Sequence, residues 1–173
     1  EGPWDKDPAR SLRGGPMVRP GVYQARLTVD GITQTQSFEV KVDPKLDLTK
    51  TGLEDIQAQE NLSLQVVALE DSSKRVAEEI KARRKELAKL IKAGKKVKQY
   101  TQEDKRLAQI EEQLVTADGI YMTPMLIDQV RYLRYMLNQA DQRPGKDAYD
   151  RFEELRNRFS TIITPYIKLG PKM

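Results

Sequence analysis

The sequence predicts a mainly helical α+β fold: an N-terminal β-hairpin followed by an antiparallel bundle of three to four helices, one of them long. Residues 22–42 alternate apolar and polar side chains on either side of Asp30-Gly31, a strong signal for a two-residue turn. Apolar residues then recur every three or four positions through most of 51–169, which is the period of an amphipathic helix. Capping and turn residues divide this helical run into segments.

The hairpin is predicted at Val22–Val29 and Ile32–Val42, with Val29 opposite Ile32 and Pro44 stopping the second strand. This register places the apolar residues on one face, so we expect that face to be buried and the other to be wet. Two strands do not make a stable sheet alone. Residues 1–20, a helix, a second copy or a domain outside this sequence could cover the apolar face. Its members are Tyr23, Ala25, Leu27, Val29, Ile32, Phe38, Val40 and Val42.

The residues before the hairpin, Glu1–Pro20, are rich in proline and glycine and are predicted to be irregular. Trp4 is the single tryptophan. We interpret it as a packing anchor, with a sugar-stacking platform as the alternative. The expected organisation is therefore an irregular segment plus hairpin over 1–46 and a helical bundle over 47–173.

The first helix is predicted from near Thr51, where Thr51-Gly-Leu-Glu54 fits a capping box, to Gly94. Its apolar positions alternate spacings of four and three over about four heptads, as in a coiled coil. Ser73 and Arg83 interrupt this seam. The full seam is Leu62, Val66, Leu69, Ser73, Val76, Ile80, Arg83, Leu87 and Leu90.

Three shorter helices are predicted after a tip at Gly94–Thr101. The second runs over 102–116 with Thr101 as its cap, the third follows Thr123-Pro124, and the fourth covers 146–169 after a turn at 143–145. Pro165 could kink the fourth helix or end it early. The predicted inward residues are Leu107, Ile110 and Leu114, then Leu126, Val130, Leu133, Leu137 and Ala140, then Phe152, Leu155, Phe159, Ile162 and Tyr166.

The composition excludes several kinds of chemistry, because the chain has no cysteine and no histidine. Disulfides, Cys nucleophiles, Cys/His zinc sites and a catalytic histidine are therefore ruled out. Adjacent carboxylates such as Glu78-Glu79 point about 100° apart on a helix, which does not suit acid/base catalysis. The same pattern occurs at Glu111-Glu112 and Glu153-Glu154. We predict no enzyme, no catalytic residue, no cofactor and no metal.

Two weaker site candidates are charged. Asp43, Asp47, Glu54 and Asp55 offer oxygen ligands for calcium, but their spacing fits no EF-hand, and a capped hinge is the preferred interpretation.

The excess of positive charge, net +4 overall, gathers in Lys81–Lys98, where nine cations face one acidic residue. We interpret that stretch as a solvated helix end, with an anionic surface as the alternative. Nucleic acid is disfavoured because no aromatic platform accompanies the charges.

The best partner-binding candidate lies on the third predicted helix. Tyr132 and Tyr135 flank Leu133 at the edge of the apolar row, with arginines beside them. Tyrosine and arginine are the residue types enriched at interface hot spots. Packing tyrosines with hydroxyls at the surface is the alternative. The candidate residues are Arg131, Tyr132, Arg134 and Tyr135.

A sequence pattern runs through the hairpin: PG-x-Y-x-x-x-L-x-V-x-G, then F-x-V-x-x-D-P. Its positions are Pro20, Gly21, Tyr23, Leu27, Val29, Gly31, Phe38, Val40, Asp43 and Pro44. With this pattern, residues 16–60 resemble the C-terminal tail of large exported bacterial proteins that carry sortilin-like or Asp-box (BNR) propellers of the glycosyl-hydrolase-like type, in which an immunoglobulin-like segment precedes helices. Other bacterial immunoglobulin-like domains share the first part of the pattern. No Asp-box is present, so no propeller residue carries over.

The resemblance implies a partial immunoglobulin-like unit in 1–46, an exported protein that is periplasmic or secreted, and an accessory role. We therefore expect a non-catalytic interaction module whose partner is a protein or the upstream propeller. A self-associating coiled-coil scaffold is the first alternative, since the Leu62–Leu90 seam could pair between copies. Binding to an anionic surface through Lys81–Lys98 is the second. No apolar run approaches the ~20 residues that a membrane-spanning helix needs.

Overall fold

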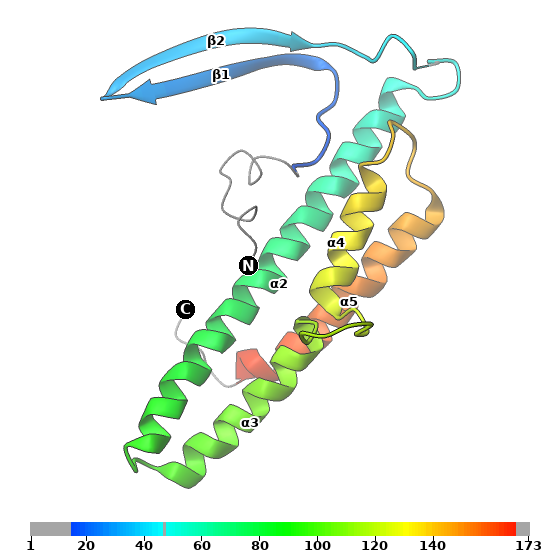
Figure 1. Cartoon of the computed structure of the whole chain (residues 1–173). Coiled ribbons are helices and arrows are strands. Elements are labelled where there is room, and N and C mark those ends of the chain that lie inside the picture. The colour runs from blue at the N-terminus through cyan, green and yellow to red at the C-terminus, as the bar shows by residue number, and fades with distance from the viewer. Residues whose placement is uncertain (1–14, 47, 169–173) are drawn as a thin grey trace. The chain divides into compact units, whose positions relative to one another are not determined.

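A computed structural model describes residues 15–46 and 48–168. The described chain is one antiparallel hairpin followed by four helices, with 61% of residues helical and 12% in strands, so the predicted α+β, mainly α class is confirmed (Figure 1). Predictions that concern Trp4, Asp47 and Leu169 lie outside the described residues. The elements are β1 (Gly21–Val29), β2 (Ile32–Val40), α2 (Leu53–Lys92), α3 (Val97–Leu114), α4 (Leu126–Leu137) and α5 (Lys146–Lys168).

The described residues form two compact units, one within 1–64 and 137–144 and the other within 65–136 and 145–173. The first unit contains the hairpin, whose predicted register is confirmed: Val29 pairs with Ile32, and Tyr23 pairs with Phe38. Asp30 and Gly31 both have positive φ, at 50° and 78°, as a tight hairpin turn requires. The second strand ends at Val40, two residues before the predicted end.

The expected burial of one hairpin face is wrong for the described chain. Leu27 and Ile32 are 66% and 70% exposed, and Phe38 is 48% exposed. The physical reason is that a two-stranded ribbon has no second layer of its own, and no described segment of its own unit packs over these side chains.

Gln59 organises the helical part of the first unit. Its side chain is buried, and its amide nitrogen donates to the carbonyls of Leu137 and Ala140, the latter at 2.8 Å. Its amide oxygen accepts from the backbone N–H of Gln142 at 3.0 Å. One side chain therefore satisfies three backbone groups, one at the last residue of α4 and two in the segment that follows it.

The start of α2 corrects the predicted capping box. Gly52, not Thr51, precedes the helix, and its N–H donates to the carboxylate of Asp55 at 3.0 Å. The capping interaction lies one residue later than predicted: Gly52 is the cap, and Asp55, three positions after it, accepts the hydrogen bond instead of Glu54. At the other end Gly94 has φ 73°, and the N–H of Lys95 donates to the carbonyl of Leu90. This is the Schellman ending that a glycine after the helix predicts.

The second unit holds a core drawn from all four helices. Apolar side chains at heptad-like spacing face inward, and residues such as Val66, Ile80 and Leu155 are completely buried. Ser73, which interrupts the predicted seam, is also buried and donates its hydroxyl to the carbonyl of Leu69 at 2.7 Å. The buried apolar set is Val66, Leu69, Ala77, Ile80, Leu87, Leu107, Ile110, Leu114, Leu126, Ile127, Val130, Leu133, Phe152, Leu155, Ile162 and Tyr166.

Two helix starts in this unit differ from the predictions. α3 begins at Val97 after Lys96 in the left-handed region, so Thr101 lies inside the helix and is not its cap. The turn between α2 and α3 is shorter than predicted, so α3 begins earlier in the sequence. α4 begins at Leu126, and the hydroxyl of Thr116, not that of Thr123, accepts from the N–H of Met125 at 2.9 Å.

The inward rows of the later helices are confirmed except at their edges. Phe159 is half-buried, and Ala140 is exposed beyond the end of α4. Pro165 lies inside α5, which continues to Lys168. Among the described residues, no helix combines the length and the apolar character needed to cross a membrane.

Candidate functional site

The predicted tyrosine and arginine patch lies on α4, on the side away from its buried row. Tyr132 and Tyr135 are 64% and 59% exposed. Their spacing of three puts them on one face, while Val130 and Leu133 point into the core. The structure thus brings the two tyrosines together at the surface.

The two arginines of the patch have a structural partner that the sequence analysis missed. Glu70 on α2 is completely buried, and its carboxylate lies 3.1 Å from Arg134 and 3.5 Å from Arg131. Lys74, one turn further along α2, lies 2.6 Å away. The distances are those of ion pairs, but none of the contacts has the angles of a hydrogen bond.

Burying a carboxylate is costly unless cations surround it. Arg131 and Arg134 therefore hold α4 to α2, and only part of each guanidinium remains for a partner. The available signal was the position of Glu70 directly after Leu69, on the inward side of the heptad seam.

A second ionic cluster joins α2 to α3. Arg84 contacts Asp104 at 2.9 Å and Glu111 at 2.6 Å, while Arg83 contacts Glu103 at 2.8 Å and Glu86 at 3.2 Å. The hydrogen bond to Asp104, followed by that to Glu111, raises the pKa of Arg84 above its ordinary value. The hydrogen bond to Glu103 does the same for the pKa of Arg83. Both arginines of the basic stretch are thus engaged by carboxylates.

The lysines of the same stretch are not engaged in this way. Within the described part of the chain, no carboxylate or other group pairs with their ammonium groups, and all of them are exposed. An open hollow of about 310 Å³ lies between α2 and α3, lined by Lys81, Arg84, Lys85, Ala88, Asp104 and Glu111. The remaining lysines of the stretch are Lys89, Lys92, Lys95, Lys96 and Lys98.

The hairpin carries an apolar face that no other described segment of its own unit covers. Tyr23 stacks on Phe38 with ring centroids 6.0 Å apart, which protects one end of the face. Toward the turn Leu27, Val29 and Ile32 are all more than half exposed. In the described chain, β1 and β2 pair only with each other, so each strand also has an open edge.

The loop between α3 and α4 adds a second exposed apolar group that sequence reasoning did not single out. Ile120 is 83% exposed, and Tyr121, with φ 59°, is fully exposed. The signal was an Ile-Tyr-Met run that belongs to no helical period. Val115 and Met122 are the other exposed apolar residues there.

The paired glutamates diverge as helix geometry predicts. Glu153 pairs with Arg156, whereas Glu154 pairs with Arg151. Glu79 accepts from the hydroxyl of Tyr166 at 3.0 Å. Burial, followed by this hydrogen bond, raises the pKa of Tyr166 to about 12.

The calcium alternative gains no support from the described residues. Asp43 accepts from the N–H of Lys45, and Asp55 caps α2, so both carboxylates serve local backbone groups. No cluster of acidic residues suited to a metal ion occurs in 15–46 or 48–168.

Comparison of the chain with protein-family models, curated proteins and solved structures finds no match.

Proposed function

We propose that this chain is a non-catalytic accessory module of an exported, periplasmic or secreted bacterial protein with a sortilin-like or Asp-box propeller. In this proposal the hairpin completes an immunoglobulin-like β unit, and the helical part supports or docks the partner. The observation that carries it is the exposed apolar face of the hairpin, with Leu27 and Ile32 at 66% and 70% exposure.

The physical chemistry of the hairpin supports docking to β structure. Full burial of one aliphatic side chain contributes about 1.5–3 kcal/mol, and the hairpin offers Leu27, Val29 and Ile32 side by side. Each open strand edge can also accept a further strand through main-chain hydrogen bonds. A partner with an incomplete sheet would satisfy both requirements.

The test is binding between this chain and the separately purified propeller and immunoglobulin-like portion of the parent protein, measured by calorimetry. We expect saturable binding that the double substitution Leu27→Lys/Ile32→Lys abolishes. The matched control is Thr28→Lys/Thr33→Lys, which adds the same charge to the opposite face of the same two strands. Absence of binding, or equal loss in both variants, would contradict the proposal.

The non-catalytic part of the proposal is tested separately. We expect the purified chain to hydrolyse neither glycosides nor peptides above the uncatalysed rate. A hydrolytic activity that co-purifies with the chain and disappears on substitution of one of its carboxylates would overturn this part.

The scaffold alternative has less support. Its basis was the seam of α2, and Val66, Ile80 and Leu87 of that seam are buried against the helices of their own unit. Light scattering over a concentration series separates the two ideas. A monomer favours the accessory module, whereas a dimer dispersed by Leu27→Lys/Ile32→Lys would assign the hairpin to self-association.

A further inference from the structure

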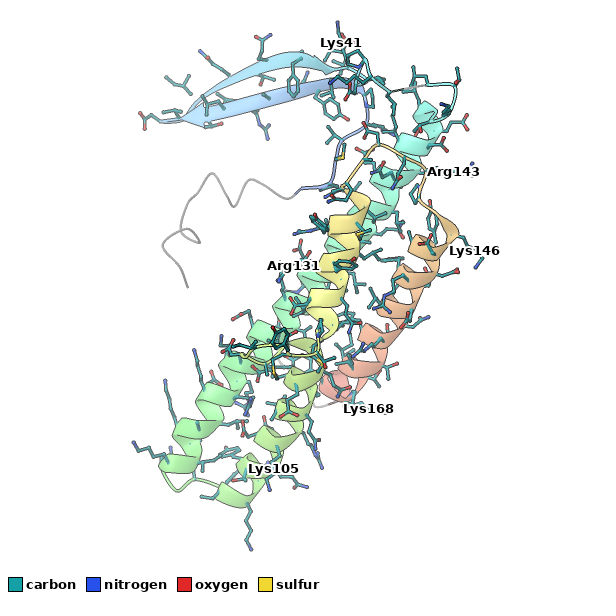
Figure 2. The ribbon with its side chains drawn as sticks, turned by 45° about the vertical axis from the view of Figure 1, so that its right-hand side comes forward. Lys41, Lys105, Arg131, Arg143, Lys146 and Lys168 are labelled. Carbon is teal, nitrogen blue, oxygen red and sulfur yellow. The ribbon has the colours of Figure 1, made fainter. Side chains whose placement is uncertain are left out.

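The α2–α3 turn carries a cluster that we name the lysine tip. Its lysines occupy sequence positions from the last turns of α2, through the turn, to the first turn of α3. Figure 1 shows the backbone of these elements. Lys105 lies on α3 close to this turn and adds another exposed cation (Figure 2). The lysine tip comprises Lys81, Lys85, Lys89, Lys92, Lys95, Lys96 and Lys98.

The fold does not neutralise this cluster within the described residues. The nearby carboxylates of Glu103, Asp104 and Glu111 pair with Arg83 and Arg84. The acidic groups that could compensate the lysines are therefore used by the arginines, and the lysines contribute an uncompensated positive potential.

Helix stability explains only some of these lysines. Lys89 and Lys92 lie in the last turn of α2, where a cation interacts favourably with the helix dipole. Lys96 and Lys98 stand at the N-terminus of α3, which has no acidic residue in its first turn. A cation at that end of a helix is unfavourable. Their presence costs folding energy and thus points to a role outside the fold.

The chemistry of the cluster indicates the class of partner. Arginine forms bidentate, directional contacts with phosphates and bases, but both arginines here are engaged. Lysine acts as a point charge without a fixed geometry. No exposed aromatic ring accompanies the lysines in 81–98, so stacked bases would find no platform. Val97, the first residue of α3, is 43% exposed between Lys96 and Lys98 and adds an aliphatic contact.

We propose that the lysine tip binds the surface of a lipid bilayer that contains acidic phospholipids. Mobile anionic headgroups suit point charges spread over a turn, because each lysine near such a surface is attracted to it without needing a fixed geometry. The inference is independent of the hairpin, so its failure would leave the proposed accessory function untouched.

The experiment is sedimentation of the full chain with phosphatidylcholine vesicles. One set of vesicles contains ~30 mol% phosphatidylserine as the acidic lipid, and the other set contains none. We expect binding only to the anionic vesicles, and a fall in binding as added salt screens the charges. The variant Lys92→Glu/Lys95→Glu/Lys96→Glu should bind roughly 100-fold more weakly. Replacing the same three lysines by arginine should preserve binding, because charge alone is required.

The matched control is Lys41→Glu/Lys45→Glu/Lys168→Glu, which changes the net charge equally at exposed lysines that do not belong to the lysine tip. This variant should keep binding within about threefold of the unmodified chain. Circular dichroism checks that both variants fold. No binding of the unmodified chain to the anionic vesicles, or equal loss in the two reversal variants, would overturn the proposal. Tip-dependent binding to a DNA duplex but not to vesicles would likewise overturn it, in favour of nucleic acid.

Discussion

The hairpin and the second unit are built from equally regular apolar patterns, yet they differ in what the pattern contacts. In the second unit, Ile80, Leu87 and Leu155 are completely buried. In the hairpin, Leu27 and Ile32 are mostly exposed. Periodicity therefore predicts which side chains share a face, but it does not say whether the chain itself supplies the opposite surface. The difference separates residues that hold the fold from residues available to a partner.

The sharpest test of the buried side is Leu87→Asp. The substitution places a charge at a completely buried position of α2, so we expect a loss of about 5 kcal/mol in the free energy of unfolding. Ala88→Asp is the matched control, because the neighbouring side chain is exposed and should cost less than about 1 kcal/mol. Urea unfolding measures both. Similar costs would mean that the α2 core is not packed as described.

A smaller loss is expected from the ionic cluster around Glu70. Arg131→Met/Arg134→Met leaves the buried carboxylate with Lys74 alone and should cost about 3 kcal/mol. Adding Glu70→Met to that variant should restore most of the loss, since an apolar side chain needs no counter-charge. Thermal unfolding of the series decides the point. Failure of the added substitution to restore stability would show that the arginines act through something other than Glu70.

The Tyr166 contact predicts a loss of stability confined to high pH. The pKa of Tyr166 is about 12 in the folded chain, against 10.0 for an ordinary tyrosine. Because the pKa is higher in the folded chain than in the unfolded one, protonated Tyr166 stabilises the fold. This contribution to the free energy of unfolding is complete below about pH 10 and is lost as the pH rises toward 12. Tyr166→Phe should remove this part of the pH dependence. The free energy of unfolding is measured for both chains between about pH 9 and 12, roughly the window around tyrosine ionisation. The same dependence on pH in both chains would contradict the prediction.

Phe38→Ala tests a partly exposed residue of the hairpin. A fully buried phenylalanine costs about 3–5 kcal/mol when truncated. Phe38 is 48% exposed and its described ring contact is the stack on Tyr23, so we expect about 1 kcal/mol. Denaturant unfolding measures this cost. A value near the buried figure would mean that the apolar face of the hairpin is covered in solution.

Much of the fold was predictable because it depends on local spacing. The register at Val29 and Ile32 follows from the Asp30-Gly31 turn, and the glycine ending of α2 follows from Gly94. The first residues of the helices were harder to predict. In sequence, Thr101 and Thr123 are as plausible as capping residues as Gly52 and Thr116 are. The choice among these capping residues depends on how each helix packs against its neighbours, which the local sequence does not show.

The candidate site was predictable only in part, for the same reason. The exposure of Tyr132 and Tyr135 follows from helix period, whereas the commitment of Arg131 and Arg134 depends on Glu70, which is distant in sequence. The lysine stretch was visible in composition. That its arginines are paired and its lysines are not depends on carboxylates placed by α3.

The smallest expected effect on folding is on the exposed apolar face of the hairpin. Leu27→Thr/Ile32→Thr keeps β-propensity and removes only exposed aliphatic surface, so the free energy of unfolding should change by less than about 0.5 kcal/mol. The same substitution should abolish docking to a β partner, because the removed surface is what the partner would bury. Parallel measurement of denaturant unfolding and partner binding separates the two effects. A large loss of stability would place these side chains with the core, and the contrast between the two regions would then disappear.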